Sequence, residues 1–372
     1  MRWRRARNLV GYWAADGFRL ENPLTRRIVR VDVSAVRILA EFTDWADPAE
    51  VAVALGYSAG SFDTGVRALA ERHLLVAEGD LHAAEDDRLA DSEWRDWGAT
   101  ATALHFGTKN TPYQHATDEL RAAMVAESPS PPLFKAYPDA PRILLPRMPC
   151  RLDAPFGDVL YGRRTHRTFA PDPVSRHTLS TLLAAVFGPK DFLHAGEFGA
   201  LMLRTSPSGG ARHALEAYVV PLRVPDVERG LYHYNPLEHS LELLTEQVTG
   251  EQLAVLCHDQ TALEQAAFVV VLTAVVHRMS WKYPGPRAYR VLMLDAGHLG
   301  QSFVLTATAL GLGPFQTAAF ADEEVEALLG VDGVRETALY VLAAGMPDAD
   351  PAGAVTFLHP PAGLAAFRDT RL

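Results

Sequence analysis

The run Phe268–Val276 constrains the fold most, because it is almost entirely apolar and shows no alternation with polar residues. Strands with one face in water alternate, whereas a continuous apolar run is typical of a strand covered on both faces. We therefore predict a central strand here and a second buried strand at Leu339–Gly345. A long helix rich in small residues is predicted at Leu294–Leu310, and an alternating hairpin strand at Gly230–Pro236. Together these elements predict an α+β fold.

Composition excludes several classes of protein. The chain has 372 residues, of which 48% are hydrophobic, enough for two domains with a sizeable core. Its net charge of -10 argues against general nucleic-acid binding. Cys150 and Cys257 stand far apart without ligand-like spacing, so neither a disulfide framework nor a metal site is predicted. No signal peptide and no apolar run of roughly 18 residues is evident, which predicts a cytoplasmic protein without membrane contact.

The first 80 residues carry the pattern of a small sheet followed by three helices. Strands are predicted at 8–13, 17–21 and 27–32, helices at 34–42, 48–55 and 61–73, and a closing strand at 74–76. This order is that of a winged helix-turn-helix, whose best-known use is DNA reading. The third helix, however, carries only two arginines against two acids, which weakens that interpretation.

The same order of elements resembles the PqqD-like peptide-recognition domain of ribosomal-peptide maturation systems. In that family the leader segment of a precursor peptide docks as an added strand and packs on the third helix. The resemblance covers about residues 8–78 and implies a peptide-recognition domain at 1–80. A purely structural domain without a partner is the alternative.

A linker and helical segment is predicted at 81–147. Its first part, to about Glu93, is rich in Asp, Glu and Ala and indicates a linker or an exposed helix, and a further helix is predicted at 118–126. The remaining residues, 148–372, form the second predicted domain.

Three arginines fall within one short stretch of that domain, at Arg163, Arg164 and Arg167. Fixed guanidiniums so close together repel one another unless an anion lies between them, and phosphate suits their planar donor geometry. A solvated basic turn is the alternative reading of this stretch alone.

Two glycine-containing segments follow, Ser206–Gly210 (Ser-Pro-Ser-Gly-Gly) and Gly311–Gly313 (Gly-Leu-Gly). Each is a weak signal singly, the second being a plain helix terminator. Their order after the arginine stretch resembles the FMN-dependent nitroreductase fold. With Gly230–Tyr234, Lys282-Tyr283 and Arg287–Arg290, the chain over about residues 94–347 resembles the SagB-type dehydrogenases, azoline oxidases of thiazole- and oxazole-modified peptide pathways.

The resemblance implies FMN as cofactor, a homodimer with flavin at its interface, a leader-bearing peptide as substrate, and a cyclodehydratase of the same pathway as partner. It implies that Arg163, Arg164 and Arg167 contact the phosphate and ribityl oxygens of FMN. The flavin ring would be lined by Pro207, Ser208 and Gly209, and a second loop on the phosphate side would contain Gly311 and Gly313. Where the family commonly has a glycine pair, this chain has Ala318-Ala319, which puts that backbone contact in doubt.

Lys282 and Tyr283 are the predicted catalytic pair. Oxidising an azoline removes a hydride and a proton, so a base is needed beside the flavin, and an ammonium group favours the phenolate of a neighbouring Tyr. A surface lysine beside a packed tyrosine is the alternative. His213 and Tyr289 are predicted substrate contacts, and His298 a packed core histidine.

The predicted function is therefore an FMN-dependent dehydrogenase that oxidises azoline rings in a ribosomally made peptide. The alternatives are an FMN-dependent reductase of a dehydroamino acid, nitro or quinone substrate, and a flavin-free scaffold that binds a leader peptide.

Overall fold

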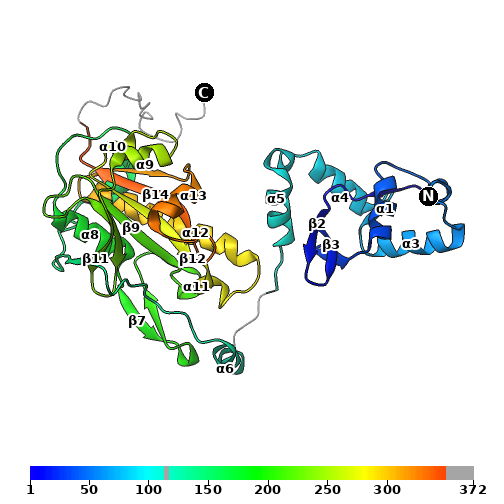
Figure 1. The fold of residues 1–372 in the computed structure, drawn as a ribbon, viewed down its shortest axis with the longest axis horizontal. Coiled ribbons are helices and arrows are strands. Elements are labelled where there is room, and N and C mark those ends of the chain that lie inside the picture. Colours follow the sequence, from blue (N-terminus) through cyan, green and yellow to red (C-terminus); the bar gives the residue numbers. More distant parts are fainter. Residues whose placement is uncertain (113–116, 349–372) are drawn as a thin grey trace. The chain divides into compact units, whose positions relative to one another are not determined.

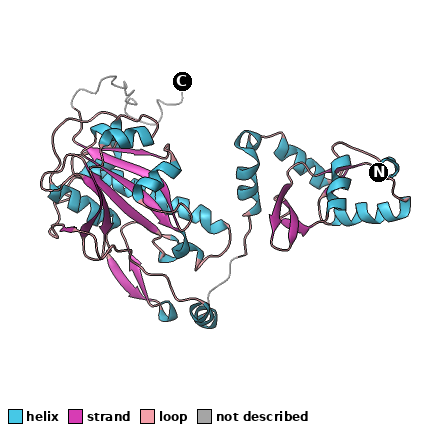
Figure 2. Ribbon diagram, viewed as in Figure 1, coloured by secondary structure: helices cyan, strands magenta, loops and turns pink. Residues whose placement is uncertain are grey.

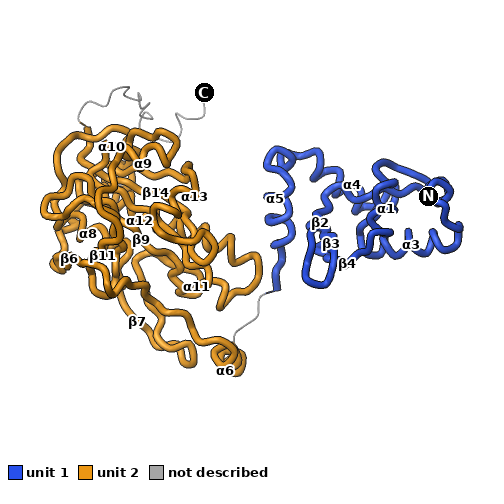
Figure 3. Tube along the Cα trace, viewed as in Figure 1, with its two compact units in different colours: residues 1–114 blue, residues 115–372 orange. Residues whose placement is uncertain are grey.

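The structure is a computed structural model that describes residues 1–112 and 117–348. The chain divides into two compact units, residues 1–114 and 115–372 (Figure 3). The division falls inside the segment predicted as a linker, and the predicted end of the second domain, 349–372, lies outside the described residues. None of the helices in the described part of the chain has the length and apolar character required to cross a membrane.

Within residues 1–112, the first unit contains two small sheets and five helices, whose arrangement Figure 1 shows. Strand β1 pairs with β5, and β2, β3 and β4 form a three-stranded antiparallel sheet. The elements are β1 (Trp3–Arg5), β2 (Val10–Ala14), β3 (Gly17–Asn22), β4 (Arg27–Arg30), α1 (Val33–Glu41), α2 (Pro48–Leu55), α3 (Ala59–Glu71), β5 (Leu75–Ala77), α4 (Leu81–Ala90) and α5 (Trp94–Gly107). The predicted winged-helix-like order is confirmed.

Local capping chemistry explains why α2 starts where the sequence predicted. The side chain of Asp47 accepts a hydrogen bond from the backbone N–H of Ala49, and Pro48 occupies the first helical position of α2. Helix α3 starts at Ala59, two residues before its predicted start. The core of this unit packs α1, α2 and α3 together, with Phe42, Phe62 and Leu74 fully or almost fully buried.

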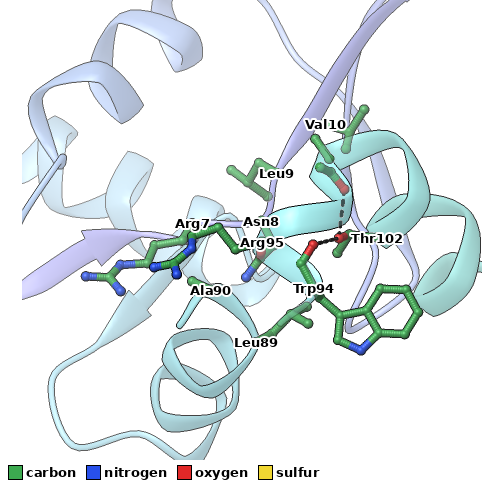
Figure 4. Close-up of a pocket in the computed structure, with 11 residues that line it drawn as sticks. Arg7, Asn8, Leu9, Val10, Leu89, Ala90, Trp94, Arg95 and Thr102 are labelled. Carbon is green, nitrogen blue, oxygen red and sulfur yellow. Dashed lines mark hydrogen bonds between the residues drawn. The ribbon is translucent and has the colours of Figure 1, made fainter. Parts of the chain in front are cut away.

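The acidic stretch after β5 is a helix with one buried face. Arg4, only 3% exposed, forms ion pairs with Asp86 at 3.2 Å and Asp87 at 2.6 Å, and Asp86 also accepts hydrogen bonds from the backbone of Arg7 and the side chain of Asn8. These bonds fasten α4 to the N-terminal strand. Figure 4 shows the cleft of about 210 Å³ beside this junction, where the Thr102 hydroxyl donates to backbone oxygens of α5.

The second unit is built on a seven-stranded sheet with helices on both faces (Figure 2). The strand order is β13-β14-β12-β9-β10-β11-β6, and every pairing is antiparallel. The strands of this unit are β6 (Arg142–Leu144), β7 (Asp191–His194), β8 (Ala200–Leu203), β9 (Leu215–Pro221), β10 (Gly230–Asn235), β11 (Ser240–Glu246), β12 (Phe268–Val275), β13 (Gly313–Thr317) and β14 (Glu336–Gly345). The helices are α6 (Asp118–Glu127), α7 (Phe156–Gly162), α8 (Arg176–Phe187), η1 (Gly196–Phe198), η2 (Gly209–Ala211), α9 (Gly250–Leu256), α10 (Ala262–Gln265), α11 (Val276–Ser280), α12 (Arg287–Ala309) and α13 (Asp322–Leu329).

The predicted central strand, β12, separates two hydrophobic cores. Phe268, Val270 and Leu272 face the core formed with α8 and α12, whereas Val269 and Val271 face the core formed with α9, α10 and α13. Each of these side chains is 0–1% exposed, so burial of each contributes about 1.5–3 kcal/mol. The predicted α+β class and the central position of this strand are confirmed.

Helix α12 is longer than predicted. It starts at Arg287, seven residues before the predicted start. The prediction missed this first part because the sequence between Arg287 and Met293 mixes charged and apolar residues, which hides the helical pattern. The whole Arg287–Arg290 motif therefore belongs to the first turn of this helix. Its C-terminus leads into the Gly-Leu-Gly segment.

Candidate functional site

The arginine turn, residues 163–167, follows α7 and packs against the start of β13. The backbone N–H of His166 donates to the carbonyl of Pro314 at 2.9 Å. A Cβ on Gly313 would stand only 2.7 Å from the His166 ring, so glycine is required for this close approach. Gly311 has φ +76 and terminates α12 in a left-handed conformation. The structure thus brings the arginine turn and the Gly-Leu-Gly segment together.

The three arginines of the turn differ in their contacts. Arg164 Nη1 donates to the backbone carbonyls of Tyr161 at 2.7 Å and Arg163 at 2.8 Å, which helps to hold the turn in shape. Arg163 is half-buried and Arg167 is exposed. Across residues 1–112 and 117–348, no carboxylate forms an ion pair with Arg163 or Arg167. Both guanidiniums therefore have donors available for an anion.

The serine-glycine loop, residues 206–210, is held on the middle of α12 by Asp295. The Ser208 hydroxyl donates to Asp295 Oδ2 at 2.6 Å, and the Gly209 N–H donates to both carboxylate oxygens at 3.2 Å. Ser208 Oγ also accepts the N–H of His213 at 2.9 Å. Burial raises the pKa of Asp295, and the hydrogen bonds from Ser208 and Gly209 oppose that rise. Pro207 is exposed at the tip of the loop.

Lys282 and Tyr283 meet over Gly210 of this loop. A Cβ on Gly210 would overlap the Tyr283 hydroxyl and stand 3.0 Å from Lys282 Nζ. Lys282 Nζ donates to the Gly210 carbonyl at 3.3 Å. A Cβ on the neighbouring Gly209 would overlap a methyl group of Val291. The glycine pair therefore lets two polar side chains approach the loop backbone closely.

Lys282 is partly enclosed by apolar and cationic groups. Its Nζ lies 5.2 Å from the centroid of the Phe198 ring, and the guanidinium of Arg121 on α6 lies over the same ring at 5.7 Å. Burial, followed by the positive charges of Arg212 and Arg121, lowers the pKa of Lys282. Lys282 therefore lies in half-buried, positively charged surroundings, and its catalytic role stays a prediction.

The second unit matches a known protein family. The model of the nitroreductase family matches residues 160–346, which is half of the chain. The chain belongs to the nitroreductase family. The matched segment contains the arginine turn, the serine-glycine loop, the Lys282-Tyr283 pair and the Gly-Leu-Gly segment. The nitroreductase-like fold predicted from the order of these motifs is confirmed.

Individual relatives agree with this assignment. A protein of Methanocaldococcus jannaschii described as a nitroreductase, MJ1384, is 34% identical over 47% of this chain and 83% of its own length. The trifolitoxin-processing protein TfxB of Rhizobium leguminosarum bv. trifolii is 30% identical over 45% of this chain and 46% of its own length. The resemblance to the SagB-type, peptide-maturation branch of the nitroreductase family is thereby confirmed. The chain spans about half the length of this second relative.

A solved structure shares the fold. The crystal structure of a protein of Anabaena variabilis described as a nitroreductase superimposes with a TM-score of 0.50 at 25% sequence identity. The match covers 64% of this chain and 49% of that chain.

The nitroreductase family implies a flavin, and the residues present fit one. Arg163 and Arg167, which form no ion pair among the described residues, offer donors suited to a phosphate, and the Gly209-Gly210 pair adds no side chains of its own to the loop. These two halves of the site are attached to one rigid element, because the serine-glycine loop binds Asp295 and the arginine turn packs beyond the C-terminus of α12.

The remaining predicted residues lie near the loop but differ in exposure. His213, a predicted substrate contact, is only 5% exposed, and burial together with the charges of Arg204, Arg212 and Arg278 lowers its pKa to about 3. Tyr289 is 51% exposed on the first turn of α12. The prediction that His298 is a packed core histidine is wrong: its side chain is exposed on α12.

The structure adds a buried polar network that sequence reasoning missed. His233, fully buried, makes bonds of 2.9 Å to both Glu216 and Glu242, and Glu216 forms an ion pair with Arg278. Burial alone would lower the pKa of His233, but the two carboxylates outweigh it and raise that pKa. His233 lies inside the Gly230–Tyr234 motif that carries part of the family resemblance, a signal that could have singled it out.

The segment 128–137, which precedes β6, joins this network to the site. Trp281 Nε1 donates to the carbonyl of Ser128 at 2.9 Å, and Arg278 Nε donates to that of Pro132 at 3.0 Å. The N–H of Tyr137 donates to Glu242 at 3.0 Å. Nothing in the sequence of this proline-rich stretch indicated that buried charges would hold it.

Proposed function

We propose that the protein is an FMN-dependent dehydrogenase that oxidises azoline rings to azoles in a ribosomally made peptide. The observation that carries the proposal is the meeting of Lys282 and Tyr283 over Gly210, in the loop that would line the flavin ring. The relative named trifolitoxin-processing protein supports a peptide as substrate.

The pair suits a reaction in which a proton must be removed. The hydride acceptor is supplied by the flavin when it is bound. The ring proton passes to the Lys282-Tyr283 pair. The half-buried amine of Lys282 and the phenol of Tyr283 both lie beside Gly210 of the loop. Burial, followed by the positive charges of Arg212 and Arg121, lowers the pKa of Lys282, so the amine form that can accept a proton is reached more easily than in an exposed lysine.

Asp295 positions the loop without contacting the reacting atoms. Its carboxylate is engaged by Ser208 and Gly209 from one side and is 3% exposed, so the acid is not available to the peptide. Its contribution is to fix the loop, and with it Gly210, on α12. Preorganised backbone of this kind limits the motion available to the base.

The test uses purified full-length protein reconstituted with FMN and a peptide that contains azoline rings. We expect each oxidised ring to lose the mass of one hydrogen molecule, measured by mass spectrometry. Lys282→Ala and Tyr283→Phe should each lower turnover about 100- to 10,000-fold while flavin absorbance is retained. Full turnover in both variants with flavin bound would refute the proposed roles. Reduction of a dehydroamino acid, nitro or quinone substrate without azoline oxidation would favour the reductase alternative. A colourless protein that binds no FMN would favour the scaffold alternative.

The first unit is proposed to bind the leader segment of the peptide at strand β4. This strand is the last of its sheet, and the N–H of Val31 donates to the carbonyl of Phe18, so by alternation the backbone N–H groups of Ile28 and Arg30 face the open edge. Ile28 is 53% exposed there. An extended peptide can add to such an edge by main-chain hydrogen bonds, and the exposed Arg27 and Arg30 favour an acidic one.

The flavin unit is proposed to act as a homodimer in which each flavin contacts both copies. About 22 Å of helix separate Asp295, which holds the serine-glycine loop, from Leu310 at the end of α12. The ribityl phosphate arm of FMN spans only about 8 Å between ring and phosphorus at the extended spacing of covalent bonds. This distance supports a site in which the arginine turn of one copy and the serine-glycine loop of the other hold one flavin.

Exposed apolar side chains support the same dimer. Phe156 and Tyr161 of α7 are 70% and 78% exposed, and Leu294 of α12 is 62% exposed. Gly297 of the same helix has open space where a Cβ would stand. α7 and α12 contact each other, so these groups belong to neighbouring elements that a second copy would cover. A cyclodehydratase of the same pathway is proposed as a further partner.

A further inference from the structure

Arg212 is a buried cation that forms no ion pair with any carboxylate in residues 1–112 and 117–348. Its side chain is 1% exposed, and its guanidinium lies over the Trp281 ring at 5.1 Å. Nε donates to the carbonyl of Arg278 at 3.2 Å and Nη2 to the Ser130 hydroxyl at 3.4 Å. Nη1 is buried and has no hydrogen-bond partner among the described residues. Burying a charge in this way is costly unless another group benefits from it.

Two ionisable groups that could benefit are Lys282 and Tyr283, and the charge of Arg212 acts on both. Arg212 follows Gly210 by two residues, and Gly210 is the point at which the heads of Lys282 and Tyr283 meet. The closest buried acid in the sequence, Glu216, is already engaged by Arg278 and His233. The positive charge of Arg212 is therefore not neutralised by an ion pair and acts on the pair above the loop.

We propose that Arg212 is a positioning residue that biases the Lys282-Tyr283 pair toward its deprotonated forms, so that the pair accepts the proton of the substrate ring more readily. Arg212 does not contact the substrate in this proposal, because its guanidinium is sealed beneath Trp281. A fixed positive charge disfavours the ammonium form of Lys282 and favours the phenolate form of Tyr283. The role rests on the proposed base function of the pair.

Two electrostatic effects agree with this role. The charge of Arg212 ranks after burial among the causes that lower the pKa of Lys282. The pKa of Arg212 itself is lowered by burial, and the charge of Tyr283 opposes that change, which indicates that Arg212 and Tyr283 interact. Arg remains protonated through the physiological range, so the charge is constant.

Other charged groups on the surrounding elements modify the balance. Arg121 pairs with Asp118 on α6, Arg278 pairs with Glu216, and Asp295 is held by the serine-glycine loop. The titratable and charged side chains on the elements around the pair are Asp118, Glu119, Arg121, Glu127, Glu197, Arg212, His213, His277, Arg278, Arg287, Tyr289, Arg290, Asp295 and His298. Of these, Arg212 and Arg121 are the cations that lower the pKa of Lys282.

The test measures the protonation of Lys282 directly in the full-length protein. Trace acetylation over a range of pH, quantified by peptide mass spectrometry, gives the pH at which Lys282 becomes reactive, with the exposed Lys190 as internal reference. We expect Lys282 to become reactive at lower pH than Lys190 in the unaltered protein. Arg212→Met should shift the Lys282 midpoint to higher pH and leave Lys190 unchanged, whereas Arg212→Lys, which keeps the charge, should preserve the unaltered midpoint.

Three results would overturn the proposal. One is equal reactivity of Lys282 and Lys190 in the unaltered protein, which needs no variant to fold. The second is an unchanged Lys282 midpoint in folded Arg212→Met, and the third is an equal shift in Arg212→Lys and Arg212→Met, which would indicate a merely structural role. The acetylation profile does not depend on azoline oxidation. If the predicted acetylation midpoints are found but the protein does not oxidise azolines, the proposed function is refuted and the role of Arg212 is not. If azolines are oxidised but the midpoints differ from those predicted, only the role of Arg212 is refuted.

Discussion

Gly210→Ala tests whether the approach of Lys282 and Tyr283 to the loop matters for catalysis. Gly210 has φ +61, where an L-residue costs about 1–2 kcal/mol. The new Cβ would also overlap the Tyr283 hydroxyl, but the heads of flexible side chains can move aside. We therefore expect a stability loss of about 1–2 kcal/mol, or a Tm decrease of roughly 2–4 °C per kcal/mol for a unit of this size. The displacement of the pair by about 1 Å should lower kcat roughly 100-fold.

Gly330→Ala is the matched control for this variant. Gly330 has φ +70 at the C-terminus of α13, and nothing lies within 4 Å of the position of its missing Cβ. It carries the same backbone cost without touching the site, so thermal unfolding should change by a similar amount while kcat stays at the unaltered value. If Gly210→Ala turns over azoline peptide as fast as Gly330→Ala, with flavin bound in both, the pair is not poised over the loop for chemistry.

Three further predictions follow from other parts of the structure. The double variant Arg163→Ala/Arg167→Ala should lose FMN absorbance. Its co-expression with Gly210→Ala should yield mixed dimers with one intact site each, which recover part of the turnover. No recovery would contradict a flavin shared between copies. Arg30→Pro removes the outward N–H of β4 and should weaken leader-peptide binding measured by calorimetry, whereas Arg30→Ala keeps that N–H and should retain main-chain binding; equal loss in both would argue against strand addition. His233→Gln should destabilise the protein more at pH 6 than at pH 9 in urea unfolding, because a pKa raised by folding adds stability below the ordinary value near 6.5 that is lost as pH rises through the folded value. A pH-independent difference would mean that His233 is not held as a cation.

Local chemistry predicted most of the elements. Ser175 caps α8: its hydroxyl accepts the N–H of Thr178 at 3.0 Å, and serine is a favoured residue at that position. Gly188 ends that helix for a different reason than a left-handed turn: its φ is -72, and a Cβ there would collide with the Ala184 carbonyl. Capping and apolar patterning act within a few residues, which is why the sequence reveals them.

Long-range charge pairing could not be predicted in the same way. The pairing of β1 with β5 joins residues 70 to 74 positions apart. Strand β1 is a short basic stretch, and its Arg4 can be buried because Asp86 and Asp87 pair with it. The acidic segment that contains these aspartates therefore read as solvated when it was considered alone. Its charge became informative only with its partner identified.

The candidate site shows the same limit more sharply. The residue types of the Lys282-Tyr283 pair were predicted through the family resemblance, but the causes of its properties come from segments distant in the sequence. Phe198 and Arg121 enclose Lys282 from η1 and α6, and Arg212 approaches from the serine-glycine loop. No spacing rule links these positions, because the sheet and α12 bring them together.

The wrong prediction for His298 follows from the small residues of α12. Small residues in a helix are typical of close packing against a neighbour, and burial of His298 within the chain was the simplest consequence. Instead, Gly297 and His298 are exposed on the stretch of α12 that separates the arginine turn from the serine-glycine loop. In the proposed dimer this stretch is the one a second copy would cover, since each flavin would join the two ends of different helices. Packing between copies would then explain the small residues, and the exposed side chain of His298 would become buried when the dimer forms.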